Sequence, residues 1–184
     1  MIASASTNNT RGTGPVTLGY TCYTQQTGNY CGPASAQILI RGAGKSSTVT
    51  QSTLASQLGT TTSGTNFSSA WTTTLNSYWG YSLFALKWGT ASGWETSYRN
   101  CMIIDVNTGR HGAINNIYCY ASTVNLPGWT SGHIAHYVTV DGINATTNQV
   151  HYLDPSNTAT GRFGGHWVSF STMATATQQR GIIF

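Results

Sequence analysis

The stretch that most constrains the fold is residues 25–40, where a polar loop turns abruptly into a helix around Cys31. Pro33 suits the first turn of a helix, because the N–H that it lacks would have no partner there. The apolar residues that follow favour a helix, which Gly42 ends after Arg41. Cys31 is therefore predicted at a helix N-terminus, where free N–H groups and the positive end of the helix dipole lower the pKa of a thiol. Such a thiol is a candidate nucleophile.

Gln25 lies six residues before Cys31, and the segment Cys-Gly-Pro-Ala-Ser starts at Cys31 itself. The spacing resembles that of the papain-like cysteine peptidases, and the segment resembles their C39-like branch, the bacteriocin-processing peptidases. In that family the glutamine amide and the N–H of the nucleophile form the oxyanion hole. The resemblance implies these roles for Gln25 and Cys31. A buried structural cysteine at a helix start is the alternative interpretation of this motif taken alone.

The base for this cysteine is predicted to be His136, which opens an apolar strand. Strand alternation places His136, Val138 and Val140 on one face. The C39-like pattern has such a strand, followed by a second strand that ends in Asp-Pro, and residues 150–155 end in this way. If the two strands pair, Asp154 comes within reach of one His136 nitrogen. The resemblance then implies a Cys, His, Asp triad in which Asp154 fixes the imidazole.

Other polar residues are alternatives for these roles. His133 could be the base, although it follows a flexible Ser-Gly pair and is expected at the rim of the cleft. Asp105, at the end of a predicted strand, is an alternative orienting carboxylate, and Gln26 is the alternative to Gln25. The remaining histidines are expected to be structural or carry no signal: His111, His151 and His166.

The chain has four cysteines, Cys22, Cys31, Cys101 and Cys119, and their spacing matches no zinc motif. With Cys31 as the free nucleophile, one disulfide is expected among the other three. The pair Cys101–Cys119 is favoured because both residues belong to the predicted sheet half. A metal site at His133 and His136 lacks a third ligand with suitable spacing. No metal or organic cofactor is expected.

Composition narrows the class of protein. The 184 residues suit one domain, and only 7% of them are charged. The net charge is +4, but the eight Lys and Arg are scattered, so no nucleic-acid partner is predicted. No apolar run has the length of a membrane span. The polar, weakly charged composition indicates a secreted protein. Because residues 1–6 lack a signal-peptide core, we expect the signal to have been removed.

The predicted fold is α+β and papain-like: an N-terminal arm over 1–20, a helical lobe carrying the Cys over about 21–100, and an antiparallel sheet lobe carrying His and Asp over about 101–184. Beyond the Cys31 helix, the expected helices are 50–58, 66–79 and 92–99. The expected strands are 81–88, 101–106, 134–140, 150–153, 167–170 and 181–184. Residues 109–132 are expected to form a loop or hairpin.

The function predicted from these features is that of a cysteine peptidase that hydrolyses a peptide or amide bond through a Cys31 thioester. Its partner would be a peptide or protein substrate, and the sequence gives no indication of the oligomeric state. Family members attached to exporters cut leader peptides after Gly-Gly, but we do not predict that specificity for this chain. The alternatives are a peptidoglycan amidase, endopeptidase or acyl transferase that uses the same site, and a non-enzymatic binding domain on a peptidase fold.

Overall fold

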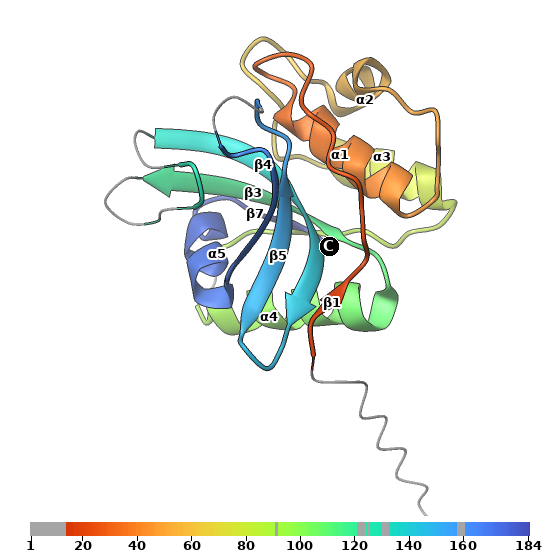
Figure 1. Ribbon diagram of the computed structural model, residues 1–184. Coiled ribbons are helices and arrows are strands. Elements are labelled where there is room, and N and C mark those ends of the chain that lie inside the picture. Colours follow the sequence, from red (N-terminus) through yellow and green to blue (C-terminus); the bar gives the residue numbers. More distant parts are fainter. Residues whose placement is uncertain (1–13, 91, 121–123, 125, 130–132, 158–160) are drawn as a thin grey trace, which may run out of the picture.

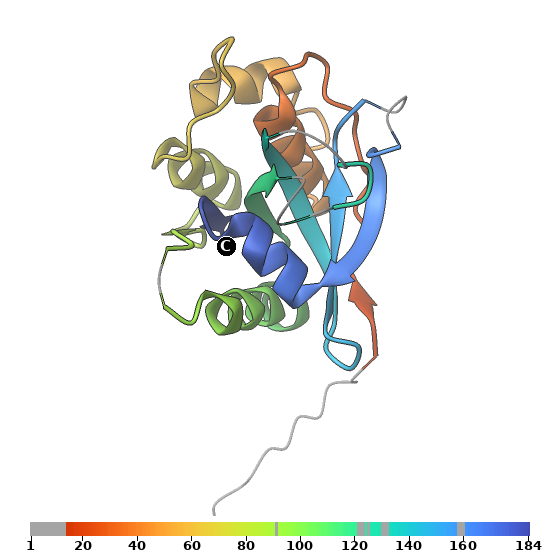
Figure 2. The same ribbon diagram turned by 90° about the vertical axis from the view of Figure 1, so that its left-hand side faces the viewer.

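A mixed sheet-and-helix architecture is present in the computed structural model, which describes residues 14–90, 92–120, 124, 126–129, 133–157 and 161–184. Its helices form two groups around one antiparallel sheet, with α1, α2 and α3 together and α4 and α5 together (Figures 1 and 2). The α+β fold predicted from the sequence is confirmed. Of the predicted N-terminal arm, residues 1–13 lie outside the described part of the chain.

The first group contains α1 (Cys31–Gly42), α2 (Gln51–Leu58) and α3 (Ala70–Trp79). The predicted helix over 50–58 is confirmed: the Thr50 side chain accepts a hydrogen bond from the Thr53 N–H, and Gly59 ends the helix in the left-handed region at φ 64°. The predicted helix over 66–79 is present but begins later, at Ala70.

Helix α1 is buried along its whole length from Gly32 to Ile40. A side chain on Gly32 would collide with the side chain of Thr65, so glycine allows the start of the helix to pack closely there. On the sheet side, the Thr139 hydroxyl donates to the Ser35 carbonyl at 2.9 Å. These contacts fix the position of the helix N-terminus, and therefore of Cys31, against the sheet.

The sheet has the strand order β2-β7-β3-β4-β5-β6, with β1 paired to β4, and every pair is antiparallel. Its long strands are β3 (Ala113–Tyr120), β4 (His133–Asn144) and β5 (Gln149–Asp154). The others are β1 (Val16–Thr17), β2 (Leu86–Lys87), β6 (Gly164–Ser169) and β7 (Gly181–Ile183). The register of β4 against β5 pairs Thr139 with Leu153, which brings the start of β4 to the end of β5.

The second group of helices consists of α4 (Trp94–Met102), continued by a π-helical segment η1 (Ile103–Gly109), and α5 (Phe170–Thr177). They share a core with Val138 and Val140 of β4, whereas Tyr137, the residue before Val138, packs with the helices of the first group. This is the alternation expected of a strand with both faces covered. No helix among the described residues is long and apolar enough to cross a membrane.

Four expectations for secondary structure are wrong. Of the strand expected over 81–88, only Leu86–Lys87 is in a strand, β2. Residues 101–106 are the end of α4 and the start of η1 instead of a strand. Residues 113–120 of the predicted loop or hairpin form the central strand β3. Phe170, expected in a closing strand, begins α5, with the Ser169 hydroxyl capping that helix.

Candidate active site

Cys31 is the first residue of α1 and is half-buried, as its sequence motif predicts. Burial alone would raise the pKa of its thiol, but a hydrogen bond and positive charge from His136 outweigh that effect. Backbone hydrogen bonds from Tyr137 and Gly32 act in the same direction. The net result is a pKa below the usual value of a thiol. Cys31 is therefore placed to react as a thiolate.

His136 is buried, and its Nε2 donates to Oδ1 of Asp154 at 2.8 Å. Burial alone would lower the pKa of the imidazole, but the negative charge of Asp154 raises it to about 10. For Asp154, burial alone would raise the pKa, and the charge of His136 instead holds it below its usual range. The three side chains thus favour a thiolate, an imidazolium and a carboxylate in a row.

Ser156, the second residue after Asp154, supports the His136–Asp154 pair. The N–H of Ser156 donates to Asp154 Oδ1 at 2.8 Å, and its hydroxyl donates to the same oxygen at 2.5 Å. The hydroxyl also lies 3.2 Å from Nε2 of His136. The β4–β5 register explains this position, because continuing the pairs of the two strands places residue 156 opposite His136.

Trp129 covers the same pair from the connection between β3 and β4. Its indole N–H donates to Oδ2 of Asp154 at 2.7 Å, and its ring lies 4.9 Å from the His136 ring, centroid to centroid. Both carboxylate oxygens of Asp154, which is fully buried, therefore have hydrogen-bond donors. A fully satisfied buried carboxylate holds a fixed orientation and charge.

Gln25 stands beside this row, and its backbone is held at the end of β5, where its N–H donates to the Pro155 carbonyl at 2.7 Å. The side-chain NH₂ donates to the Thr27 carbonyl at 2.9 Å, which uses one of its two hydrogens. The neighbouring Gln26 has an exposed side chain, and its backbone N–H donates to Gln51 Oε1 at 2.8 Å. Of the two glutamines, only Gln25 lines the cavity that contains Cys31.

That cavity has a volume of about 260 Å³. The predicted residues Gln25, Cys31 and His136 line it, together with Ser156 and the residues Gly28, Trp129, Ile134, Ala135, Asn157 and Arg162. Asp154 lies behind His136 and does not line it. The structure therefore brings all four sequence-predicted site residues together, three on the cavity wall and one beneath it.

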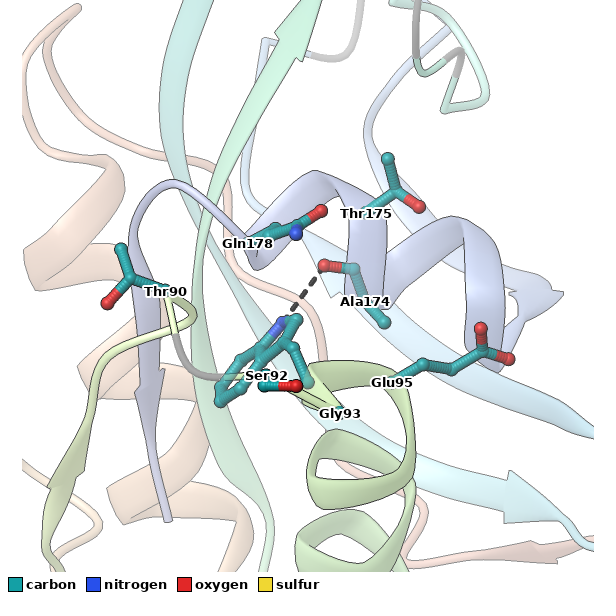
Figure 3. Close-up of a pocket in the computed structure, with 8 residues that line it drawn as sticks. Thr90, Ser92, Gly93, Glu95, Ala174, Thr175 and Gln178 are labelled. Carbon is teal, nitrogen blue, oxygen red and sulfur yellow. Dashed lines mark hydrogen bonds between the residues drawn. The ribbon is translucent and has the colours of Figure 1, made fainter.

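A larger cavity, of about 530 Å³, lies between the N-terminus of α4 and the C-terminal part of α5 (Figure 3). Trp94 forms part of its wall, and its indole N–H donates to the Ala174 carbonyl at 3.0 Å. The lining includes Glu95 but no cysteine or histidine, so this cavity lacks a nucleophile paired with a base. The smaller cavity is the candidate active site.

The predicted disulfide is wrong for this structure, because all four cysteines are free. Cys22 faces the Asp154 carbonyl, with 3.3 Å between sulfur and oxygen. Cys101 lies 4.0 Å from the Lys87 ammonium group. Cys119 is buried on β3, and burial raises the pKa of its thiol to about 11. Cys22 and Cys101 thus have different neighbours, and neither is bonded to Cys119.

The alternative residues lie as follows. His133 is the first residue of β4, and its side chain lies outside the described part of the structure. Asp105 is buried in η1 and has no hydrogen bond to His136. His151 bonds through Nδ1 to Asp141 at 2.6 Å, which makes a second His–Asp pair outside the candidate cavity.

Sequence reasoning missed Ser156, Trp129 and Arg162. Ser156 had a signal, since a carboxylate that accepts from the N–H two residues later is a common turn. Trp129 and Arg162 lie in or beside loops, and nothing local marks their contact with residues far away in the sequence. Only the packed structure shows them at the cavity.

The fold, with a buried helix that starts at Cys31 and an antiparallel sheet that carries His136 and Asp154, is that of a papain-like cysteine peptidase. More narrowly, the model of the Peptidase_C39 like family matches residues 17–174. The chain belongs to this family. No curated protein matches it.

Several solved structures share the fold. The peptidase domain of Streptococcus ComA, a bifunctional ABC transporter involved in quorum sensing, is 17% identical with a TM-score of 0.55, covering 90% of this chain and 96% of that chain. A putative C39-like peptidase from Bacillus anthracis is 15% identical with a TM-score of 0.55, covering 92% and 96%. A double-glycine-motif protease from an AMS/PCAT transporter, solved with its leader peptide, is 13% identical with a TM-score of 0.54, covering 92% and 94%.

Proposed function

We propose that the protein is a cysteine peptidase that cleaves a peptide or amide bond through a thioester at Cys31. The observation that carries this proposal is that Cys31 and His136 line one cavity, with Asp154 bonded to His136 behind it. A lone buried cysteine would need none of these partners, and its pKa would be raised, as burial raises that of Cys22 to about 12. Membership in the Peptidase_C39 like family supports the same reaction class.

In the proposed reaction the Cys31 thiolate attacks the carbonyl carbon, and the carbonyl oxygen becomes an oxyanion. The free N–H of the Gln25 amide and the backbone N–H of Cys31 stabilise that oxyanion. Since Nε2 of His136 faces Asp154, the proton that moves is the one on Nδ1. His136 gives this proton to the leaving amine, which departs and leaves the thioester.

Hydrolysis of the thioester returns the enzyme to its starting state. His136, now neutral, takes a proton from a water molecule that attacks the thioester carbonyl. The Cys31 thiolate leaves, and the acid product is released. Throughout, Asp154 keeps its charge and orients the ring, while Trp129 and Ser156 hold Asp154.

A peptide substrate is supported by one structural neighbour, the double-glycine-motif protease, which was solved with its leader peptide. We test the proposal by incubating the wild type and Cys31→Ala with a diverse peptide library and, separately, with purified peptidoglycan stem peptides. Mass spectrometry would identify new ends. Cleavage by the wild type alone is the expected result; its site distinguishes a general peptidase from a cell-wall enzyme.

The converse result is equally informative. Cleavage that persists in Cys31→Ala would show a contaminating enzyme. Absence of any product, with Cys31 still reactive toward iodoacetamide, would contradict peptide hydrolysis and favour a binding domain on the same fold. Iodoacetamide labelling near pH 6 should modify Cys31 well ahead of Cys22 and Cys119, because burial raises the pKa of both other thiols.

A further inference from the structure

One permanent positive charge lines the candidate cavity, and the proposed mechanism does not use it. The Arg162 guanidinium lies over the Trp129 ring, 3.8 Å from its centroid, and its Nε donates to the Gly128 carbonyl at 2.7 Å. The stacking and the hydrogen bond hold the group in one orientation. Within the described part of the chain, neither Nη group has a hydrogen-bond partner, so both are available to a ligand.

The charge of Arg162 has no carboxylate partner in this chain. The sequence has four acidic residues, and the structure describes all of them. Asp154 is fully buried with both oxygens occupied, and Asp141 pairs with a histidine outside the cavity. Asp105 is buried in η1, and Glu95 lines the other cavity (Figure 3). A half-buried guanidinium without a counter-ion attracts an anion from outside.

The position of Arg162 also indicates which part of a substrate would contact it. In the proposed reaction, His136 protonates the leaving amine, so the leaving group must lie next to the His136 ring. Trp129 contacts that ring and in turn carries the guanidinium. Arg162 therefore borders the leaving-group side of the cavity. With about 260 Å³ available, the cavity holds only the part of a peptide close to the cleaved bond.

We propose that Arg162 binds a carboxylate on the leaving-group side of the substrate, so that the enzyme prefers peptides that are acidic just after the cleaved bond. This inference rests on the proposed function. The carboxylate has two sources, the side chain of an acidic residue or the free C-terminus of a short leaving peptide. A planar guanidinium suits either, because its N–H groups match the two oxygens of a carboxylate.

The first test requires no known substrate. Cys31 is alkylated with iodoacetate, which carries a carboxylate, and with iodoacetamide, its neutral counterpart of similar size. The ratio of the two rates measures the attraction of the cavity for an anion and cancels any change in the thiolate. In Arg162→Gln we expect this ratio to fall about three- to tenfold at low salt, and in Arg162→Lys by less. Added NaCl should lower the wild-type ratio.

The matched control is Arg99→Gln, which removes the same charge from another arginine stacked on an aromatic ring. Arg99 lies 5.6 Å from the Phe170 centroid and does not line the cavity. Its ratio should equal that of the wild type. An equal ratio in wild type and Arg162→Gln would overturn the proposal, and so would an equal fall in the Arg99→Gln control, which would indicate net charge alone.

The second test identifies the source of the carboxylate with matched peptides from the cleaved library sequences. One pair has Glu or Gln after the cleaved bond, both with an amidated C-terminus. The other pair has a single neutral leaving residue with a free or an amidated C-terminus. The source of the carboxylate is identified by the pair in which the charged peptide has the higher kcat/KM and in which Arg162→Gln loses that preference. Equal kcat/KM in both pairs overturns the substrate preference.

The two proposals can fail separately. If no peptide is cleaved but the alkylation ratio depends on Arg162, hydrolysis is contradicted and the anion site is supported. If peptides are cleaved and the ratio ignores Arg162, the reaction stands and the anion site is overturned.

Discussion

Nε2 of His136 lies 2.8 Å from Oδ1 of Asp154, and the two residues are 5% and 0% exposed. In a site so poorly hydrated, each charge strongly stabilises the other, which is why Asp154 raises the pKa of His136 to about 10 despite its burial. The imidazolium in turn lowers the pKa of the Cys31 thiol. Asp154 therefore influences the pKa of the Cys31 thiol through His136.

The first prediction follows from that coupling. In His136→Ala the pKa of the Cys31 thiol should rise toward or above the ordinary value of about 8.5, because burial then acts without the imidazolium. Turnover should be lost. The measurement is the iodoacetamide rate of Cys31 across a pH series. The control is His151→Ala, which breaks a His–Asp pair outside the cavity and should keep the wild-type profile.

The same pH series separates His136 from His133, which the sequence offers as the alternative base. His133→Ala should keep the low thiol pKa and much of the turnover. A profile that shifts in His133→Ala while staying unchanged in His136→Ala would contradict the base assignment.

The second prediction concerns Trp129. Trp129→Phe keeps a ring beside His136 but removes the donor to Asp154 Oδ2, leaving a buried carboxylate oxygen without its partner. The pKa of Asp154 should rise. Because that pKa is depressed in the folded state, its stabilising effect is present above the unfolded pKa of about 3.9 and is lost as the pH falls. As the pH is lowered, the variant should therefore begin to lose stability at a higher pH than the wild type. At neutral pH its free energy of unfolding should be lower by about 1–3 kcal/mol.

Trp94→Phe is the matched control for this variant. It also removes a buried indole donor, which bonds the Ala174 carbonyl and the Thr177 hydroxyl away from the active site. Both variants should lower the melting temperature. Only Trp129→Phe should move the acid limb of the pH–rate profile, and an unmoved limb would show that Trp129 is merely structural.

The third prediction tests the oxyanion donor. Gln25→Ala should lower kcat by on the order of a hundredfold, because one of two donors to the oxyanion is gone. Alkylation of Cys31 should change little, since the Gln25 side chain donates its hydrogen bond to the Thr27 carbonyl instead of to the thiol or His136. Gln26→Ala, whose side chain is exposed, is the control. Unchanged turnover in Gln25→Ala together with a loss in Gln26→Ala would transfer the role.

Some segments of the fold and of the site could be predicted from the sequence, and others could not. The helix at Cys31 and the two strands with His136 and Asp154 could be located, because Pro33, strand alternation and the Asp-Pro ending are local signals. The contacts of Trp129 with this pair could not, since they depend on the packing of a connection onto distant strands. The fold class and the central row were thus predictable, and the supporting residues were not.

The wrong strand prediction for residues 101–106 has a different cause. An apolar run of about six residues fits a buried strand and a buried helix equally well. The buried apolar positions are Tyr98, Cys101, Met102 and Val106, spaced as on a helix, while Ile104 is 59% exposed. The helical period of the apolar residues becomes visible only when the sequence is followed back to Tyr98.

The last prediction concerns Asp105, which this helical segment buries at 3% exposure with Oδ2 unpartnered. Burial raises its pKa to about 8. The folded state therefore holds a proton that the unfolded chain releases near pH 4, so stability falls as the pH rises from about 4 to 8. Asp105→Asn removes the titration and should stabilise the protein by on the order of 2 kcal/mol at pH 9, with little gain at pH 4. Chemical denaturation at both pH values measures this. The exposed Glu95→Gln should show no such difference, and an Asp105→Asn variant that is less stable at pH 9 would mean that the carboxylate is charged and held by a partner.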